Sequence, residues 1–322
     1  MRIILFFELL IFLQNSLICQ QYATYIVVSK NGDGDYTTIQ EAVNSCKSFP
    51  DKRITIYVKK GVYREKIVIH SWNTKISLIG EDRDSTIITY NDAAGKIKNG
   101  TFYTYTLKVC GNDFIAENLT IENTAGEVGQ AVALHVEADR VIIKNCNIKG
   151  NQDTLFASGE GSRQYYQNCY IEGTTDYIFG PATAIFEKCI LHSKKDSYIT
   201  AASTNENIKF GFVFIECKLT FAENISKVYL GRPWRKYAKT VFINCDLGDN
   251  IAPEGWKEWA NNENLSTTFY AEYRCYGSSA NSAKRVAWSH QLTNKQAKMY
   301  KIENIFSKSF NLISEDNKWF KN

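Results

Sequence analysis

The stretches Asn145-Cys146-Asn147-Ile148 and Asn168-Cys169-Tyr170-Ile171 repeat one phrase, Asn-Cys-x-Ile, at a spacing of 23 residues. An aspartate follows each cysteine by seven residues, at Asp153 and at Asp176. If the phrase marks one turn of a stacked coil, the two carboxylates lie on neighbouring turns, about 4.8 Å apart. Carboxylates this close ionise at different pH values, so one can act as a nucleophile and the other as an acid or base.

Looser copies of the phrase recur along the chain, with leucine or cysteine in the same slot. The slot residues are Leu119, Cys146, Cys169, Cys189, Cys217 and Cys245, at spacings of 27, 23, 20, 28 and 28 residues. Repeats of this length are typical of solenoids, and the surrounding Ile, Val, Phe, Tyr and Thr favour strands. Chance recurrence or a β-sandwich would not predict one phrase at coil spacing. The pattern therefore predicts an all-β parallel β-helix with the slot side chains stacked inside.

The ends of the chain predict export and a single domain. Residues 1–19 contain Arg2 and an apolar run, which is typical of a secretory signal peptide and too short for a membrane span. We expect a secreted or periplasmic protein, with lipid anchoring through Cys19 as the alternative. Residues 20–322 contain no linker-like stretch, so we expect one β-helix domain with a less regular tail from about residue 289.

Charge and residue content narrow the possible ligands. The net charge of +4 suits a polyanionic substrate, although an ordinary solvated surface explains it equally well. The sequence has no nucleic-acid-binding motif, no paired Cys-x-x-Cys and no histidine cluster, so we expect no nucleic-acid partner and no metal. We also expect a monomer.

Five phrases in order carry a family resemblance, together with Phe269-Tyr270-Ala271-Glu272-Tyr273 near the end. They are Gly61-Val62-Tyr63-Arg64-Glu65, Gln130-Ala131-Val132-Ala133-Leu134, Gln152-Asp153-Thr154-Leu155, Asp176-Tyr177-Ile178-Phe179-Gly180 and Leu230-Gly231-Arg232-Pro233-Trp234. From about Tyr25 to about Trp288 the chain resembles the pectin methylesterases, or pectinesterases, which demethylate pectin. The resemblance implies a right-handed parallel β-helix, methyl-esterified pectin as the partner, methanol and pectate as products, and no cofactor.

The resemblance also implies roles for five residues. Asp176 matches the nucleophile that attacks the methyl ester, and Asp153 matches the general acid and base. Gln130 and Gln152 match the amides that stabilise the oxyanion. Arg232 matches the partner of the nucleophile, which keeps that carboxylate ionised. A lone aspartate in such a turn usually serves only the turn itself.

Further residues are expected in the sugar-binding cleft. Trp234 matches an aromatic residue of the groove, and we expect Phe156, Tyr177 and Phe179 to line the same cleft. Thr106 aligns with a substrate-contacting threonine, although the surrounding motif is loose.

The cysteines of the repeat lead to a disulfide prediction. The resemblance includes a cysteine pair at Cys169 and Cys189, and their spacing of 20 residues is the shortest in the series. Adjacent turns of a coil are compatible with the length of a disulfide. We therefore predict a disulfide between these two residues and free thiols at Cys146, Cys217 and Cys245.

Departures from the family pattern leave other functions open. His135 stands where plant relatives carry arginine, Tyr177 stands where phenylalanine is usual, and Asp196 has the same offset from Cys189 without the motif. The alternatives are another ester or thioester hydrolase, a non-catalytic carbohydrate-binding β-helix, and a lyase or galacturonase. The last two enzymes need a calcium-binding acidic cluster or a set of several aspartates, and neither pattern is present.

Overall fold

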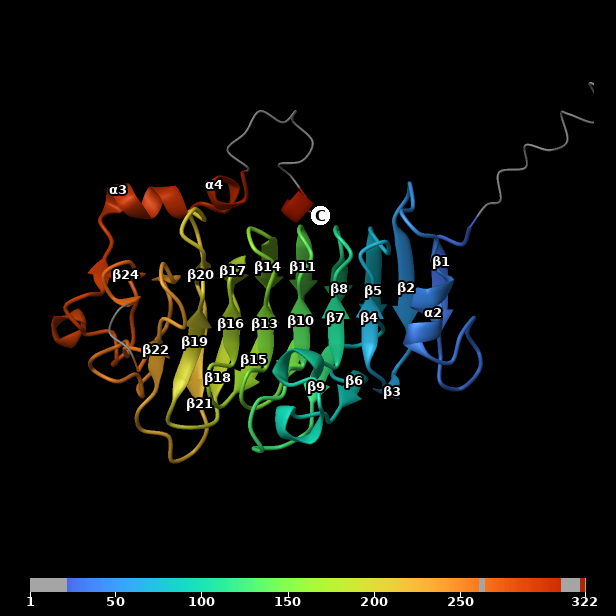
Figure 1. Cartoon of the computed structure of the whole chain (residues 1–322), viewed down its shortest axis with the longest axis horizontal. Helices are drawn as coiled ribbons and strands as arrows, with labels where there is room; N and C mark the ends of the chain where they lie inside the picture. Colours follow the sequence, from blue (N-terminus) through green and yellow to red (C-terminus); the bar gives the residue numbers. More distant parts are fainter. Residues whose placement is uncertain (1–21, 261–263, 308–318, 322) are drawn as a thin grey trace, which may run out of the picture.

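The structure is a computed structural model that describes residues 22–260, 264–307 and 319–321. The expected signal peptide at residues 1–19, its cleavage site and Cys19 lie outside these residues. Within them the chain coils through three parallel sheets, whose successive turns are stacked along the long axis of the molecule (Figure 1). The prediction of an all-β parallel β-helix is confirmed.

Each turn of the coil contributes strands to the sheets in a fixed order. Sheet A consists of β1 (Tyr25–Val28), β2 (Ile54–Val58), β5 (Ile76–Gly80), β8 (Ile115–Glu117), β11 (Val141–Lys144), β14 (Arg163–Gln167), β17 (Thr183–Glu187), β20 (Phe212–Ile215), β23 (Lys239–Ile243), β24 (Phe269–Tyr273) and β25 (His290–Gln291). Sheet B consists of β3 (Gly61–Arg64), β6 (Thr86–Tyr90), β9 (Thr120–Asn123), β12 (Asn147–Lys149), β15 (Tyr170–Gly173), β18 (Ile190–Ser193) and β21 (Lys218–Phe221). Sheet C consists of β4 (Ile67–Ile69), β7 (Leu107–Val109), β10 (Leu134–Val136), β13 (Leu155–Ala157), β16 (Ile178–Gly180), β19 (Tyr198–Ala202) and β22 (Tyr229–Gly231).

The described helices are short and lie outside the coil or between its strands. They are α2 (Ile39–Ser45), α3 (Asn294–Ala297), α4 (Ile302–Phe306) and the 3₁₀ turns η1 (Ala94–Lys96), η2 (Thr101–Tyr103), η4 (Ser282–Lys284), η5 (Lys298–Tyr300) and η6 (Trp319–Lys321). Helix α2 begins after Thr38, whose hydroxyl accepts a hydrogen bond from the Glu41 amide, and buries Ile39, Ala42 and Val43. This apolar face packs on the first turn of the coil.

The Asn-Cys phrase is explained by the corner between sheets A and B. In-register pairing places the slot residues directly above one another, and all are almost fully buried: Leu119, Cys146, Cys169, Cys189, Cys217 and Cys245. The residue before each slot has a positive φ: Asn118, Asn145, Asn168, Lys188, Glu216, Asn244 and Arg274. Asparagine tolerates this left-handed conformation better than most residues. Cys275 extends the ladder by one turn, and its sequence does not resemble the phrase because Gly277 stands where the other copies have Ile or Leu.

The predicted disulfide is wrong, because Cys169 and Cys189 are separate thiols in the structure. The two residues precede strands paired in register, Tyr170 opposite Ile190, so their side chains point inward in parallel on adjacent turns. A disulfide needs Cβ atoms closer than the strand spacing and a torsion near 90°, which parallel stacked side chains do not provide. The predicted free thiols at Cys146, Cys217 and Cys245 are confirmed.

The outer face of sheet A is apolar and is covered by the tail of the chain. Phe306 of α4 is fully buried, and Trp319 and Phe320 of η6 are nearly so. They form one cluster with outward side chains of sheet A such as Ile185 and Val241. Figure 1 shows α3 and α4 beside the ends of the sheet A strands. The tail therefore supplies a second apolar layer outside the coil.

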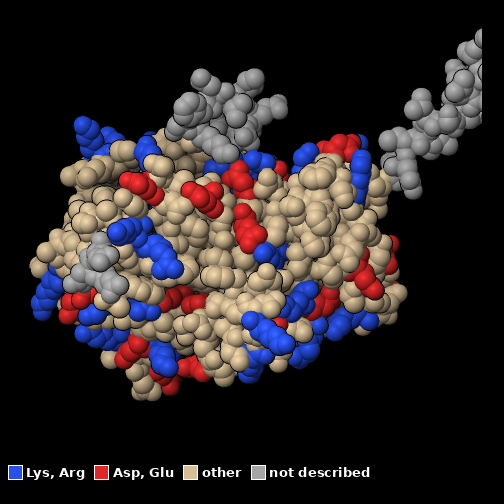
Figure 2. Space-filling model, in the orientation of Figure 1, with Lys and Arg blue, Asp and Glu red and all other residues tan. Residues whose placement is uncertain are grey.

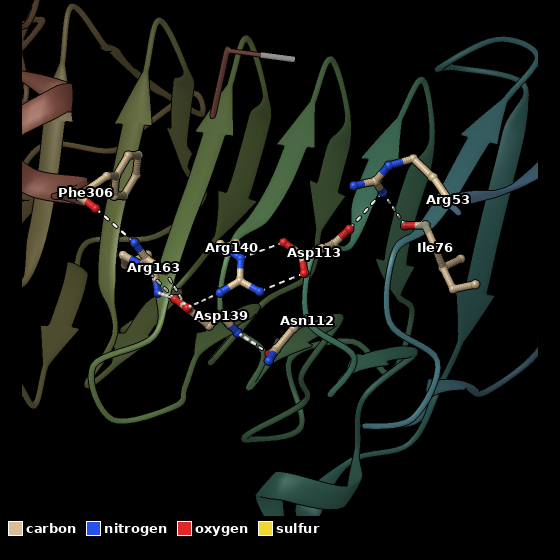
Figure 3. Close-up of polar contacts among 8 residues, drawn as sticks. All are labelled: Arg53, Ile76, Asn112, Asp113, Asp139, Arg140, Arg163 and Phe306. Atoms are coloured by element: carbon tan, nitrogen blue, oxygen red, sulfur yellow. Dashed lines mark hydrogen bonds and ion pairs between the residues drawn. The ribbon is translucent and has the colours of Figure 1, made fainter. Parts of the chain in front are cut away.

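A row of ion pairs ties this layer to the coil (Figure 3). Arg140 makes two hydrogen bonds with Asp113, of 2.6 and 2.7 Å, and a third with Asp139. Arg163, which is 4% exposed, pairs with Asp139 at 2.8 Å and donates to the Phe306 carbonyl at 3.0 Å. The row crosses adjacent turns, so it fixes their register and holds α4 in place.

The helices and the charged side chains of the described residues bear on membrane spanning and on surface charge. Among the described residues, no helix is long and apolar enough to cross a bilayer. Figure 2 shows acidic and basic side chains intermixed over the face in view. This distribution matches the small net charge.

Candidate active site

Two aspartates stand immediately before neighbouring strands of sheet C. Asp153 precedes β13 and Asp176 precedes β16, strands that pair in register through Leu155 and Ile178. Both aspartates have positive φ values, of 64° and 49°, a conformation that aspartate adopts more readily than most residues. Their amides donate to carbonyls on the next turn, at 3.1 and 2.8 Å. The equal offsets in the sequence thus place the carboxyl groups on adjacent turns at one side of the sheet.

Arg232 follows β22 and reaches back to one of the two carboxyl groups. Its Nε and Nη2 atoms donate to the two oxygens of Asp176 at 3.1 and 2.6 Å, a bidentate pair. Its guanidinium lies between the rings of Tyr198 and Trp259, at 4.1 and 3.9 Å from their centroids. Stacking on both faces fixes the plane of the guanidinium and therefore the orientation of the Asp176 carboxylate.

The surroundings give the two carboxyl groups different tendencies to ionise. Burial raises the pKa of Asp153 well above its usual range, and the neighbouring charge of Asp176 adds to the shift while Arg232 opposes it. Burial also raises the pKa of Asp176, but its hydrogen bonds with Arg232 and the charge of that residue oppose the rise. Asp153 is therefore suited to hold a proton, and Asp176 is the carboxyl group that the cation keeps ionised.

Asp153 and Asp176 line a pocket of about 300 Å³. Gln130 and Gln152 lie opposite each other in a parallel bridge at the edge of this pocket. Gln130 lies one turn before Asp153, and Gln152 lies one turn before Asp176. The residues that line the pocket are Thr101, Phe102, Gln130, Gln152, Asp153, Asp176, Phe179, Ala201, Arg232, Trp234 and Trp259. All five residues expected to do the chemistry thus share one pocket.

A row of aromatic rings forms the apolar side of the site. Phe156 and Phe179 stack at 4.5 Å with an angle of 10° between their planes. Phe102 covers Phe156 at 5.0 Å, and Trp234 meets the edge of Phe179 at 5.9 Å. These rings provide flat apolar surfaces beside the carboxylates.

A second hollow of about 790 Å³ continues from the pocket and shares Trp234 and Trp259 with it. Arg235 and Lys236 lie along this hollow, and Phe156 reaches it from the aromatic row. Together the two hollows form one groove.

His135 extends the aromatic row by one turn of the coil. It pairs in register with Phe156 and packs against that ring at 4.6 Å, with an angle of 39° between the planes. Its Nε2 atom lies 3.1 Å from Oε1 of Glu137, which also pairs with Lys108 at 2.8 Å. Burial lowers the pKa of His135, so it supports the row as a neutral ring.

Two residues expected in the cleft point elsewhere. Tyr177 is fully buried inside the coil, with its hydroxyl 3.1 Å from that of Ser193, because it alternates with the outward Asp176. Thr106 is also fully buried, and its hydroxyl donates to the Glu122 carbonyl at 2.8 Å. The threonine that reaches the pocket is Thr101.

Several pocket residues carried no signal in the sequence. Thr101 and Phe102 belong to the 3₁₀ turn η2, and Trp259 lies in a long connection after β23. Tyr198 begins β19. Two residues earlier, the carboxylate of Asp196 accepts hydrogen bonds from the Ser226 and Lys227 amides, in agreement with the structural role expected for Asp196. Only the stacking of turns brings Tyr198 of β19 and Trp259 together on the two faces of Arg232.

Comparison with known proteins identifies the family. The model of the pectinesterase family matches residues 25–309 of this chain. The chain belongs to the pectinesterase family. A relative from Arabidopsis thaliana named "Probable pectinesterase/pectinesterase inhibitor 6" is 42% identical over 299 residues, 88% of this chain. The chain spans only 52% of the length of that relative.

Solved structures of pectinesterases share the fold over nearly their whole length. The pectin methylesterase from carrot is 33% identical, with a TM-score of 0.81 over 85% of this chain and 89% of that protein. A pectin methylesterase crystallised in complex with a hexasaccharide is 30% identical, with a TM-score of 0.78 over 91% of this chain and 99% of that protein. Among the described residues of this pectinesterase homologue, no group of three or more His, Cys, Asp or Glu side chains is arranged to hold a metal ion.

Proposed function

We propose that this protein is an exported pectin methylesterase that hydrolyses methyl esters of polygalacturonate to methanol and pectate. The observation that carries the proposal is the unequal pair Asp153 and Asp176, with Arg232 bound to only one of them. The similarity to pectin methylesterases supports the substrate class. The apolar segment at residues 1–19 supports export.

The first half of the reaction uses the ionised Asp176. Its carboxylate attacks the ester carbonyl, while amide N–H groups of Gln130 and Gln152 stabilise the negative charge that develops on the carbonyl oxygen. Asp153 then gives its proton to the departing methoxide, which leaves as methanol. The product is an anhydride between Asp176 and the substrate carboxyl group.

The second half returns the enzyme to its starting state. Asp153, now a carboxylate, takes a proton from a water molecule that attacks the anhydride. Asp176 leaves as a carboxylate, which the bidentate contact with Arg232 favours, and Asp153 is protonated again. The raised pKa of Asp153 suits both the donation and the recovery of this proton.

A methanol-release assay on highly methylated pectin tests the proposal. We expect turnover by the wild type and a loss of about a thousandfold or more in Asp176→Asn. Near-normal methanol release from the variant would refute the mechanism. Release of thiol from acyl thioesters instead of methanol from pectin would indicate a different hydrolase, and shortening of the polymer would indicate a lyase or galacturonase.

A further inference from the structure

An exposed aromatic cluster lies at the N-terminal end of sheet C, away from the catalytic pocket. His70 follows β4, and its ring stacks on that of Trp72 at 4.5 Å with an angle of 10°. Trp72 is 45% exposed, and the nearby Phe49 is 70% exposed. Large apolar side chains gathered on a surface in this way often mark a binding site. We call Phe49, His70 and Trp72 the aromatic platform.

The backbone beneath the platform is rigid. The Phe49 amide donates to the Trp72 carbonyl at 2.7 Å, which joins the two loops. Asn73 is 2% exposed, and its amide donates to the His70 carbonyl at 2.8 Å. A Cβ atom on Gly111 would lie 2.3 Å from the Asn73 carbonyl oxygen, so the next turn of the coil closes tightly against this loop. The rings are therefore held in place before any ligand binds, which lowers the entropic cost of binding.

Phe49 adopts an unfavourable conformation that keeps its ring outside. Its φ of 48° lies in the left-handed region, which is rare for a bulky residue and costs on the order of 1 kcal/mol or more. The ring itself contributes little packing to the fold, since it remains 70% exposed. An exposed aromatic ring in a strained conformation is a feature expected of a binding site.

The charges around the platform select the ligand. Residues 46–53 and 70–75 contain Lys47, Lys52, Arg53 and Lys75 but only one acidic residue, Asp51. Lys47 lies 3.5 Å from the Asp51 carboxylate, and Lys75 donates to its carbonyl at 3.1 Å. Lys47 and Lys52 are exposed. Flat rings among excess positive charge fit a sugar polymer that carries carboxylates.

His70, one member of the platform, lies on the outer face of sheet C, which also carries the catalytic groove. His70 is outward by the alternation in β4, where Ile67 and Ile69 are buried. Sheet C runs from β16 through β13, β10 and β7 to β4, which is four strand steps or about 19 Å at the usual spacing. One polymer chain, or two parts of it, can therefore contact both sites.

We propose that the aromatic platform is a second binding site for polygalacturonate, which holds the enzyme on de-esterified polymer. A sugar ring packs on the exposed face of Trp72, and neighbouring carboxylates approach Lys47, Lys52 and Lys75. The choice of ligand rests on the proposed function, because the product of that reaction is the polyanion that this surface fits.

Native gel electrophoresis through unesterified polygalacturonate tests the site without reference to activity. We expect the gel polymer to retard the wild type and to retard Trp72→Ala several-fold less. Tyr276→Ala serves as the matched control, since Tyr276 is a 59% exposed aromatic residue at the other end of the coil. Equal retardation of wild type and Trp72→Ala by polygalacturonate would overturn the proposal. The same would follow if a neutral dextran gel showed the same difference in retardation between the two proteins.

Kinetic and hydrodynamic measurements complete the test. On a short methyl-esterified oligomer, Trp72→Ala should keep the wild-type kcat and KM, whereas on polymeric pectin its KM should rise several-fold. A concentration-dependent dimer of the wild type that Trp72→Ala abolishes would show that the platform binds a second copy and would overturn the proposal. Absence of methanol release from the wild type would refute the proposed function instead, while the retardation result would still stand.

Discussion

At the scale of single residues, one guanidinium distinguishes two aspartates that the sequence presents as equivalent. Both have positive φ, Asp176 is buried and Asp153 is half-buried, and loss of solvent contact raises both pKa values. Arg232 contacts only Asp176, which divides the pair into an ionised and a protonated member. The chemistry therefore depends on a contact between residues 56 positions apart in the chain.

The two aspartates should act as a unit. We expect Asp153→Asn and Asp176→Asn each to lower kcat by about a thousandfold or more, and the double variant to be little worse than either single variant. Methanol release from saturating pectin measures this. Fully multiplicative losses would mean that the two carboxyl groups act in independent steps.

Removal of Arg232 should change the pH dependence as well as the rate. Because its charge opposes the burial of Asp176, Arg232→Ala should raise the pKa of that carboxyl group further. The acid limb of the kcat/KM profile should then move to higher pH, with Arg232→Lys between the variant and the wild type. An acid limb that stays in place while kcat falls would show that Arg232 only orients the carboxylate.

At the scale of elements, a glycine at the end of β15 positions the segment that carries Asp176. A Cβ atom on Gly173 would lie 2.2 Å from Cβ of Tyr177, the inward neighbour of Asp176. Gly173→Ala should therefore displace the Asp176 strand, lower the free energy of unfolding by about 1–3 kcal/mol and reduce activity. Gly95→Ala, where a Cβ atom meets nothing within 4 Å, is the control and should change neither. Denaturant unfolding and methanol release measure both effects.

The packing of the C-terminal tail against sheet A can be measured separately from the packing inside the coil. Phe306 is fully buried on the outer face of sheet A, so Phe306→Ala should lower the free energy of unfolding by about 3–5 kcal/mol. Met299 lies in the same tail but is 46% exposed, so Met299→Ala should change it by less than about 0.5 kcal/mol. Equal effects of the two substitutions would contradict the burial of α4 against the coil.

At the scale of the whole molecule, the active site lowers the stability of the fold in a pH-dependent way. The folded state raises the pKa of Asp153, so between the unfolded and folded pKa values it binds more protons than the unfolded state. The free energy of unfolding must fall as pH rises through that range. Below about pH 3.9, where the unfolded carboxyl group is also protonated, this penalty is absent.

The variant Asp153→Asn removes this penalty. Its free energy of unfolding relative to the wild type should rise with pH, by at least about 1 kcal/mol between pH 3 and pH 7. Denaturant unfolding at several pH values measures the difference. A difference that does not change with pH would show that Asp153 ionises as easily in the folded protein as in the unfolded one.

The sequence by itself determined the coil and the location of its chemistry. The repeated Asn-Cys phrase follows from two local needs, a left-handed corner and an inward apolar side chain, and both recur from the turn of Leu119 to that of Cys275. Constant offsets from that phrase placed Asp153 and Asp176 on adjacent turns, since in-register stacking preserves offsets within each turn. Family motifs added Gln130, Gln152 and Arg232, which all reach the same pocket.

Only the tertiary structure decided what depends on direction and on contacts between distant loops. Tyr177 and Thr106 lie inside the coil at the entry to their strands, and a motif does not state which side of the sheet a residue faces. Cys169 and Cys189 remain thiols because stacked side chains are parallel, which their spacing in the chain does not reveal. Tyr198 of β19 and Trp259 of a later connection enclose Arg232 from different turns, so their positions depend on how the whole coil packs and not on any local pattern.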